Sequence, residues 1–591
     1  MAETKERRAG SPPAPDADVV LVNGTVLTLA GAPPAGAGPV TPSLAQAVAL
    51  RAGRVLAVGD DAAVRALAGR HTVVVDLGGR TAIPGLIDSH VHMVRAGLTW
   101  NEELRWEAVR SLDEGLRLIR EAAGRRPVGT WIPVVGGWHP AQLAEGRPPT
   151  RAELDHSAPE HPVYLQCMYD WVLLNRAALR ALGLTRATPD PPGATLERDG
   201  DGAPTGVARG LGAFPWLTAR LPAPTLEQQV ASTAALAREL NRLGLTGVID
   251  GGGFGTRPET YRALYELWRR RGLTVRVRLT VHPSTAGAEG EELARLVRYQ
   301  TPGLGDGRLR LLGAGEILVY AIHDVEGLWP VEVTPAARAE LYRLCRLLAG
   351  AGWPLQLHAT RNEVITAVLD AWEAVDREVR LAPLRWALLH AELIDGRNLR
   401  RARALGVGLL VQSRYRLRGD ELLARWGAPA LRDVPPLRAM LAAGLPLGAG
   451  TDAMRVAAYH PFRSLHWFVT GRSPTGARTR APEHLLTREE ALRLYTLGSA
   501  WFSFEERTRG SLEPGKRADL AVLSDDYLTV PADGLPEIES LLTLVGGRPV
   551  HARGPFAGLE LPAPAGSAPH ASRPPPPPRP SDRAPPTPAS R

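Results

Sequence analysis

Two histidines, His90 and His92, stand at the end of an apolar stretch that begins at Ala82. In a β-strand, side chains two residues apart point to the same face, so this pair can hold one cation between its imidazoles. The pair alone is weak support, because neighbouring histidines also occur by chance at solvated positions. The spacing predicts a metal site only if further ligand-type residues come close to it in the fold.

The elements that must position these histidines alternate regularly along the chain. Between residues 83 and 504, short β-type runs alternate with helical patterns, which predicts an α/β fold of the (β/α)8 TIM-barrel type. The eight strands are expected to end near His92, Asp250, His282, Glu316, His358, His390, Gln412 and Asp452. Because the carboxyl ends of barrel strands converge on one face, we expect these side chains to meet there.

The rest of the chain is predicted to form smaller parts around the barrel. Short strands and Gly/Pro turns in 18–82 and 505–553 indicate one composite β-sandwich built from both chain ends. Residues 1–17 and the proline-rich tail 554–591 lack the apolar surface of a packed core and are expected to be disordered. The stretch of about 130–224 is too long for a βα loop and predicts an insertion over the barrel mouth.

Composition narrows the function classes. The net charge of +8 over 591 residues is small and dispersed, so nucleic acid is not an expected partner. No apolar leader and no 18-residue apolar run is present, which predicts a cytoplasmic protein without a membrane partner. Cys167 and Cys345 lack metal-ligand spacing and are expected to be buried hydrophobes. The expected partners are a small-molecule substrate and further copies of the chain in a homo-oligomer.

Five stretches carry a family resemblance: 84–92, 356–359, 389–392, 448–452 and 510–523. They resemble the amidohydrolase superfamily, and most closely its metal-dependent branch that contains the N-substituted formamide deformylases. The resemblance covers about residues 18 to 553. The last stretch is typical of the family without being catalytic.

The resemblance implies a ligand set and a reaction. His90 and His92 would bind one metal, and His358 and His390 would bind metal on the opposite side. Asp452 would both touch metal and move protons. Zinc is the expected divalent ion, with one or two per subunit. Metal-activated hydroxide would then attack an amide or formamide carbon, and Asp452 would return the proton to the leaving amine.

The chain also departs from the family pattern. Many relatives bridge two metals with a carboxylated lysine on the fourth strand, but the only lysines here are Lys5 and Lys516. Glu316 is the only carboxylate of that strand, and a glutamate oxygen can ligate or bridge zinc. Alternatively, Glu316 pairs with an arginine and the site holds a single metal. Thr360 and Arg361 replace a Gly-Asp pair common in relatives, so substrate preference is not transferred.

Weaker candidates remain for substrate binding. His282 and Gln412 end the third and seventh strands and are hypothesised to contact substrate, although a packed histidine is equally common there. The run 323–326 reads as a ligand cluster, but it lies beyond the strand end and is interpreted as a loop face. The leading function is metal-dependent hydrolysis of a C–N bond. The alternatives are a non-catalytic scaffold of the same fold, or a deaminase or lactonase variant of the same chemistry.

Overall fold

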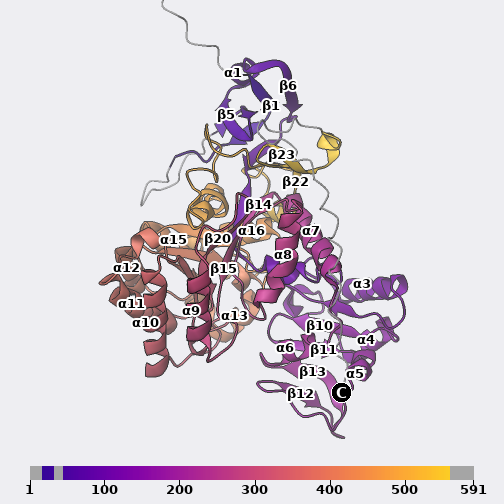
Figure 1. The fold of residues 1–591 in the computed structure, drawn as a ribbon. Coiled ribbons are helices and arrows are strands. Elements are labelled where there is room, and N and C mark those ends of the chain that lie inside the picture. The colour runs from indigo at the N-terminus through magenta and orange to yellow at the C-terminus, as the bar shows by residue number, and fades with distance from the viewer. Residues whose placement is uncertain (1–15, 32–43, 560–591) are drawn as a thin grey trace, which may run out of the picture.

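The computed structural model describes residues 16–31 and 44–559, and its centre is a parallel eight-stranded barrel (Figure 1). The strand order is β20-β19-β18-β17-β16-β15-β14-β8. The strands are β8 (Leu86–Val91), β14 (Leu245–Asp250), β15 (Arg276–Val281), β16 (Leu309–Glu316), β17 (Leu355–Ala359), β18 (Ala387–His390), β19 (Gly408–Gln412) and β20 (Leu447–Gly450). The predicted barrel is confirmed, and each strand ends within two residues of the expected position.

Backbone hydrogen bonds just past the strands bring the first and last strands together. The Asp452 N–H donates to the His90 carbonyl, and the His92 N–H donates to the Ala453 carbonyl, both at 2.9 Å. Asp88 strengthens this seam, because its carboxylate accepts the Thr451 hydroxyl at 2.6 Å. The strand that carries His90 and His92 is therefore fixed against the strand that precedes Asp452.

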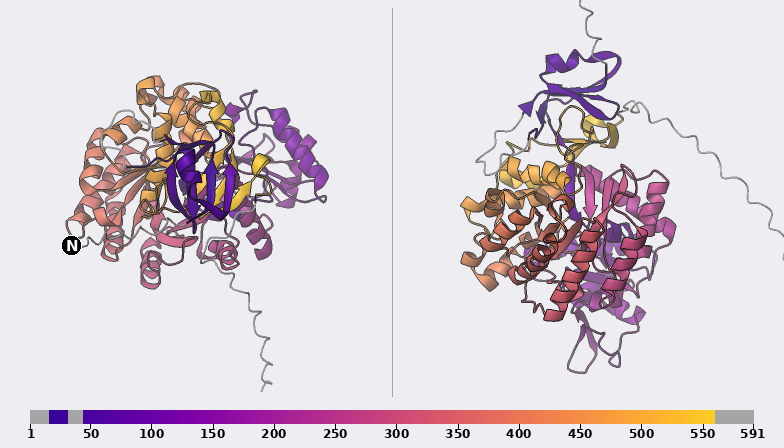
Figure 2. Two further views of the ribbon diagram at one scale, coloured as in Figure 1. Left: turned by 90° about the horizontal axis from the view of Figure 1, so that it is seen from above. Right: turned by 60° about the vertical axis from the view of Figure 1, so that its left-hand side comes forward.

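Helices between the strands cover the outside of the barrel (Figure 2). They are α2 (Met93–Gly97), α7 (Leu226–Arg242), α8 (Arg262–Arg269), α9 (Glu289–Tyr299), α10 (Pro335–Gly350), α11 (Asn362–Asp376), α12 (Gly396–Leu405), α15 (Leu437–Ala442) and α16 (Pro461–Thr470). Thr225, Thr334 and Asp395 cap three of them, each accepting a backbone N–H of the first turn. Such caps satisfy donors that the helix itself leaves free.

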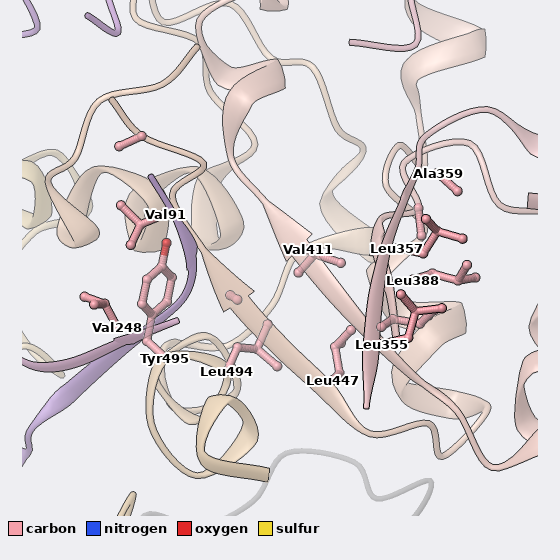
Figure 3. Packing of buried hydrophobic residues seen from close by; sticks show 14 of the residues in the cluster. Val91, Val248, Leu355, Leu357, Ala359, Leu388, Val411, Leu447, Leu494 and Tyr495 are labelled. Atoms are coloured by element: carbon pink, nitrogen blue, oxygen red, sulfur yellow. The ribbon is translucent and has the colours of Figure 1, made fainter. Parts of the chain in front are cut away.

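Alternation along the strands separates an outer and an inner apolar set. The outer set packs against the helices and includes Val248, Leu388 and Val411 (Figure 3). The inner set closes the barrel interior and comprises Ile249, Leu312, Ala387, Leu389, Leu410 and Phe502. Because neighbours on one strand point to opposite faces, the same short apolar runs build both sets. The barrel interior is therefore apolar, and the polar side chains lie at the carboxyl ends of the strands.

Strands from both ends of the chain form a six-stranded sheet, in the order β23-β22-β21-β7-β2-β3. Its strands are β2 (Thr25–Leu27), β3 (Leu44–Ala45), β7 (Thr81–Pro84), β21 (Leu520–Leu523), β22 (Ser540–Val545) and β23 (Arg548–Ala552). Strands β7 and β21 pair antiparallel. The buried pair of Arg276 and Asp519, at 2.7 Å, links this sheet to the first residue of β15.

A four-stranded sheet packs on the six-stranded sheet through a shared apolar cluster (Figure 1). Its order is β5-β4-β1-β6, with β1 (Ala17–Val22), β4 (Ala47–Arg51), β5 (Arg54–Gly59) and β6 (Ala68–Asp76). Phe556, 3% exposed, also joins this cluster, so the boundary expected at 554 lies too early. Most of the two segments expected to be disordered lies outside the described residues, and the remaining domain boundaries stay a prediction.

The chain between β8 and β14 forms a separate five-stranded sheet, in the order β12-β13-β11-β10-β9 (Figure 1). Its strands are β9 (Ile132–Val134), β10 (Val163–Cys167), β11 (Trp171–Leu174), β12 (Thr195–Arg198) and β13 (Pro204–Arg209). Trp106, Trp138 and Trp171 meet edge to face in its core. The turn after β10 reaches the barrel, where the Tyr169 hydroxyl accepts a hydrogen bond from Arg95 at 2.9 Å.

Within the described ranges, the helices are too short or too polar to cross a bilayer.

The Phe502 ring should contribute strongly to the free energy of unfolding, because it packs in the barrel interior. Replacing this 1% exposed ring by alanine removes its packing against Leu410 and leaves a cavity, at a cost of about 3–5 kcal/mol. Urea unfolding followed by far-ultraviolet circular dichroism measures the loss. Tyr299→Ala, which truncates a 74% exposed ring, is the matched control and should change stability little. Equal losses in both variants would contradict the packing role.

Candidate metal centre

Six predicted ligand residues come together at the carboxyl ends of the barrel strands. They arise from β8, β16, β17, β18 and the residues just after β8 and β20. All are buried, at 0 to 6% exposure: His90, His92, Glu316, His358, His390 and Asp452. Side chains up to 362 residues apart therefore share one small volume, as convergence of the strands predicts.

Glu316 lies at the centre of this group. Its Oε1 atom is 3.0 Å from His358 Nδ1, 3.6 Å from His390 Nε2 and 3.7 Å from His90 Nε2. Its Oε2 atom is 3.7 Å from His92 Nε2. In the described part of the chain no arginine forms an ion pair with Glu316, so the alternative that an arginine neutralises it is wrong. The carboxylate faces imidazoles on both sides instead.

Asp452 joins the same imidazoles from the other side. Its Oδ1 atom is 3.2 Å from His92 Nε2 and 3.4 Å from His90 Nε2. Its Oδ2 atom is 3.8 Å from His390 Nδ1 and 3.8 Å from an Arg414 nitrogen. The two carboxylates thus share three histidines between them.

Electrostatics keep both carboxylates ionised. Burial alone would raise the pKa of Glu316, but His358 and the neighbouring imidazoles outweigh it and hold this pKa well below its ordinary value. His90 and His92 likewise overcome burial and hold the pKa of Asp452 well below its ordinary value. Burial and the nearby Arg414 lower the pKa of His390 far enough to keep it neutral. The carboxylates in turn raise the pKa of His358 to about 9 and raise that of His90 despite burial, so a metal ion that binds these two imidazoles displaces protons from them.

Unpartnered nitrogens show that this donor set fits a metal ion. Both ring nitrogens of His90 and of His390 are fully buried and lack a hydrogen-bond partner among the described residues. Leaving a buried polar atom unpaired costs about 1–3 kcal/mol, so such atoms usually serve another ligand. Three sets of residues can each hold an ion, because within each set the ligand atoms lie within 4.8 Å of one another. The sets are His90, His92 and Glu316; His90, His390 and Asp452; and Glu316, His323 and His358. Imidazole and carboxylate donors suit zinc and similar divalent ions.

The backbone leaves its regular path at two ligands. His390 and Asp452 have φ values of 74° and 61°, in the left-handed region that side-chain-bearing residues seldom adopt. The turn at His390 lets its ring join the site although the preceding residue, Leu389, already points into the barrel. Such conformations cost on the order of 1–3 kcal/mol each and persist where the surroundings enforce them.

Two residues of the loop after β16 belong to the site, contrary to the interpretation of 323–326 as a loop face. The His323 ring lies 4.0 Å from the His358 ring, centre to centre. Asp324 Oδ1 is 2.8 Å from His358 Nε2, and Oδ2 accepts the Arg361 N–H at 2.7 Å. Asp324 therefore fixes the His358 ring so that Nδ1 faces Glu316. The sequence showed these residues, but it could not show that the loop turns inward.

Arg414 and Glu392 form a buried pair behind Asp452. Arg414 Nε donates to Glu392 Oε1 at 2.8 Å, and a terminal nitrogen donates to the Val325 carbonyl at 2.9 Å. The guanidinium therefore connects the loops after β16, β18 and β19. Its charge lies next to Asp452 and is fixed in place by these bonds.

The two predicted substrate residues lie outside the central cavity. His282 Nδ1 contacts the Pro283 carbonyl at 2.6 Å. Gln412 is fully buried, and neither atom of its amide has a hydrogen-bond partner among the described residues. The cavity, of about 30 Å³, is lined by His92, Arg95, Tyr169, Phe254, Glu316, His323, Val325, Glu326, His358, Arg414, Asp452 and Val456. The role of His282 and Gln412 in substrate binding stays a prediction.

Comparison with known proteins places this geometry in a family. The model of the Amidohydrolase family matches residues 73–551. The chain belongs to this family. The predicted recognition is confirmed, and with it the prediction that the protein is an enzyme of this hydrolase class.

Relatives of the amidohydrolase span nearly its whole length. An N-substituted formamide deformylase of Arthrobacter pascens is 28% identical over 550 residues, covering 90% of this chain and 97% of that protein. The putative amidohydrolase YtcJ of Bacillus subtilis is 25% identical, covering 81% and 90%. An uncharacterized metal-dependent hydrolase of Pyrococcus horikoshii has a similar fold, with a TM-score of 0.62, 22% identity, and coverage of 87% and 99%.

Asp324→Asn should weaken metal binding without unfolding the protein. The amide keeps the size of the side chain but holds His358 less firmly, and loss of such an orienting partner typically costs 10–100-fold in metal affinity. Titration of the chelator-treated protein with zinc measures the affinity. Asp113→Asn, at an 84% exposed side chain, is the control. Unchanged zinc affinity in Asp324→Asn would rule out the orienting role.

Proposed function

We propose that this amidohydrolase cleaves the C–N bond of amides of the N-substituted formamide type, with one or two divalent metal ions, preferentially zinc. The observation that carries the proposal is the buried cluster of four imidazoles and two ionised carboxylates at the barrel mouth. The similarity to the Arthrobacter pascens formamide deformylase supports the choice of substrate class.

The donor set divides into two groups that share Glu316. His90 and His92 approach it from the β8 side, whereas His358 and His390 approach it from β17 and β18. If two ions are bound, each group would hold one of them, and Glu316 would serve as the shared ligand in place of the carboxylated lysine of many relatives. A bound divalent ion supplies Lewis acidity, which acidifies water and polarises the substrate carbonyl.

Asp452 is the proposed proton carrier. Its carboxylate is ionised and reaches the site between His92 and His390, so it can accept a proton from the attacking water. It then protonates the leaving nitrogen, and the products are formate and an amine. The nearby Arg414 charge orients the Oδ2 atom while the proton moves.

Residues above the ligands position the substrate and limit access of water. The Phe254 ring contacts the His323 ring edge to face, with ring centres 4.8 Å apart, and the Tyr169 ring contacts Phe254 in the same way. Arg95 joins Tyr169 to the Phe254 carbonyl. The five-stranded insertion therefore contributes a wall of the cavity. A wall of this kind suits the N-substituent of an amide.

The zinc-loaded protein should release formate from N-substituted formamides, and Asp452→Asn should lower the turnover number by about 10²–10⁴-fold. The substitution keeps the shape of the side chain but removes its ability to accept a proton at neutral pH. Formate is measured with a coupled enzymatic assay on a panel of formamides, with Asp113→Asn as control. If only lactones or cyclic amidines are hydrolysed, the alternative of a lactonase or deaminase is favoured. If Asp452→Asn keeps full activity, the proton-carrier role is excluded.

Glu316→Gln should reduce the metal content from about two ions per chain toward one, because an amide is a far poorer bridge than a carboxylate. Elemental analysis of the gel-filtered protein gives the stoichiometry. Glu291→Gln, at a 77% exposed side chain, is the matched control. Two ions retained in Glu316→Gln, or a single ion in the wild type, would leave a mononuclear site. Metal content unchanged in a His90→Ala, His92→Ala double variant would contradict the ligand assignment.

A further inference from the structure

A second buried group of charged side chains lies beside the metal centre without taking part in it. Arg416 ends the short helix η5 (Arg414–Arg416) after β19, whereas Arg463 and His466 lie on α16 after β20. Their exposures are 7%, 9% and 7%. We call these three residues the Arg416 cluster. The hydroxyls of Ser413 and Ser464 are hydrogen-bonded, which joins the two elements that carry it.

Arg416 is unusual because its guanidinium has no partner. Among the residues that the structure describes, it forms neither a hydrogen bond nor an ion pair, and its Nε atom is fully buried. Two other buried arginines have acidic partners: Arg278 meets Glu505 at 2.7 Å, and Arg414 meets Glu392 at 2.8 Å. Arg480 donates to the Val434 carbonyl and lies 4.4 Å from the centre of the Trp467 ring, although its Nε and Nη1 atoms have no hydrogen-bond partner among the described residues.

Neighbouring groups add positive charge and unused donors rather than a counter-ion. Burial, then Arg463 and Arg110, lowers the pKa of the Arg416 guanidinium to about 9, so it is still charged at neutral pH. Arg463 Nε and His466 Nδ1 are also buried without a hydrogen-bond partner in the described chain. At the edge of the cluster, His460 has an unpartnered Nδ1 atom as well.

No carboxylate among the described residues forms an ion pair with Arg416, although acidic side chains lie near Arg463 and His466. Glu107 lies beside Arg463 but is 3.7 Å from Arg105, and its backbone carbonyl rather than its carboxylate accepts the Arg463 hydrogen bond. Asp533, with an 83% exposed side chain, is 3.9 Å from His466 Nε2. A buried charge without a counter-charge raises the free energy of the folded state strongly, and each unpaired hydrogen-bond donor around it raises that free energy further.

We propose that the Arg416 cluster is a binding site for an oxyanion, a carboxylate or phosphate group held by Arg416 and Arg463 with His466 as a further donor. The planar guanidinium matches such groups with two parallel hydrogen bonds, and the unused Nε atoms are the donors for them. Bound in this place, the anion neutralises the charge that the protein itself leaves uncompensated.

Two sources can supply this anion. Arg416 is two residues from Arg414, which lines the central cavity and has a nitrogen 3.8 Å from the proposed proton carrier Asp452, whereas Arg416 itself does not line that cavity. One source is an acid group on the substrate, and this alternative rests on the proposed hydrolase function. The other source is a free anion from solution, which needs no catalysis.

Thermal unfolding with inorganic phosphate tests the site without turnover. At constant ionic strength, phosphate should raise the unfolding midpoint of the wild type and of Arg400→Met, a control at an exposed arginine. Arg416→Met keeps the length of the side chain without its charge and should show no rise. It should also fold well, because it removes an unpaired charge. Arg416→Lys keeps the positive charge but lacks the planar guanidinium, so phosphate should raise its unfolding midpoint less than that of the wild type. An equal phosphate effect in wild type and Arg416→Met, or none in the wild type, overturns the proposal.

A matched pair of substrates separates the two sources. N-formylphenylalanine and N-formylphenethylamine differ only in a carboxylate. If the substrate supplies the anion, the wild type should favour the acid by roughly tenfold or more in kcat/KM, and Arg416→Met should lose this preference. A phosphate response without acid preference assigns the site to a free anion. If neither compound is hydrolysed, the hydrolase proposal fails for this class, whereas the phosphate result still decides the anion site.

Discussion

The attraction between two buried carboxylates and four imidazoles is the interaction on which the rest of the structure depends. Glu316 and Asp452 carry charge in a region where burial alone would neutralise it. The close imidazoles and Arg414 make that charge tolerable, and the carboxylates in turn help to hold the imidazoles near one another. The arrangement therefore needs a scaffold that holds six side chains to within a few ångströms. A barrel provides it, because its strands are hydrogen-bonded neighbours throughout.

The scaffold separates its apolar and polar parts along the barrel axis. Leu389 and Leu410 fill the interior below the site together with Phe502, whereas His390, the next residue along β18, belongs to the polar mouth. Loops then complete the site with groups that orient the ligands. Asp324 fixes His358, and the Arg414–Glu392 pair fixes the surroundings of Asp452. These contacts join loops after different strands, so local order at the mouth depends on the whole barrel.

The strand-borne part of the site could be predicted from sequence, but the loop-borne part could not. Strand periodicity places His90 and His92 on one face, and convergence of strand ends brings Glu316, His358 and His390 to them. No such rule applies to His323 and Asp324, because the path of a loop depends on contacts formed after folding. Arg414 and Arg416 illustrate the same limit. They stand two residues apart in the short helix η5, yet Arg414 pairs with Glu392 whereas Arg416 has no side-chain partner among the described residues.

The pairing of β7 with β21 has a consequence for the order in which the chain is made. The two strands are separated by more than 430 residues, and the whole barrel lies between them in sequence. During synthesis, β2, β3 and β7 emerge first and must wait with an open sheet edge until β21, β22 and β23 leave the ribosome. An open edge readily pairs with other chains. At about 5–20 residues per second the wait lasts on the order of a minute, so the growing barrel and chaperones must protect that edge during translation.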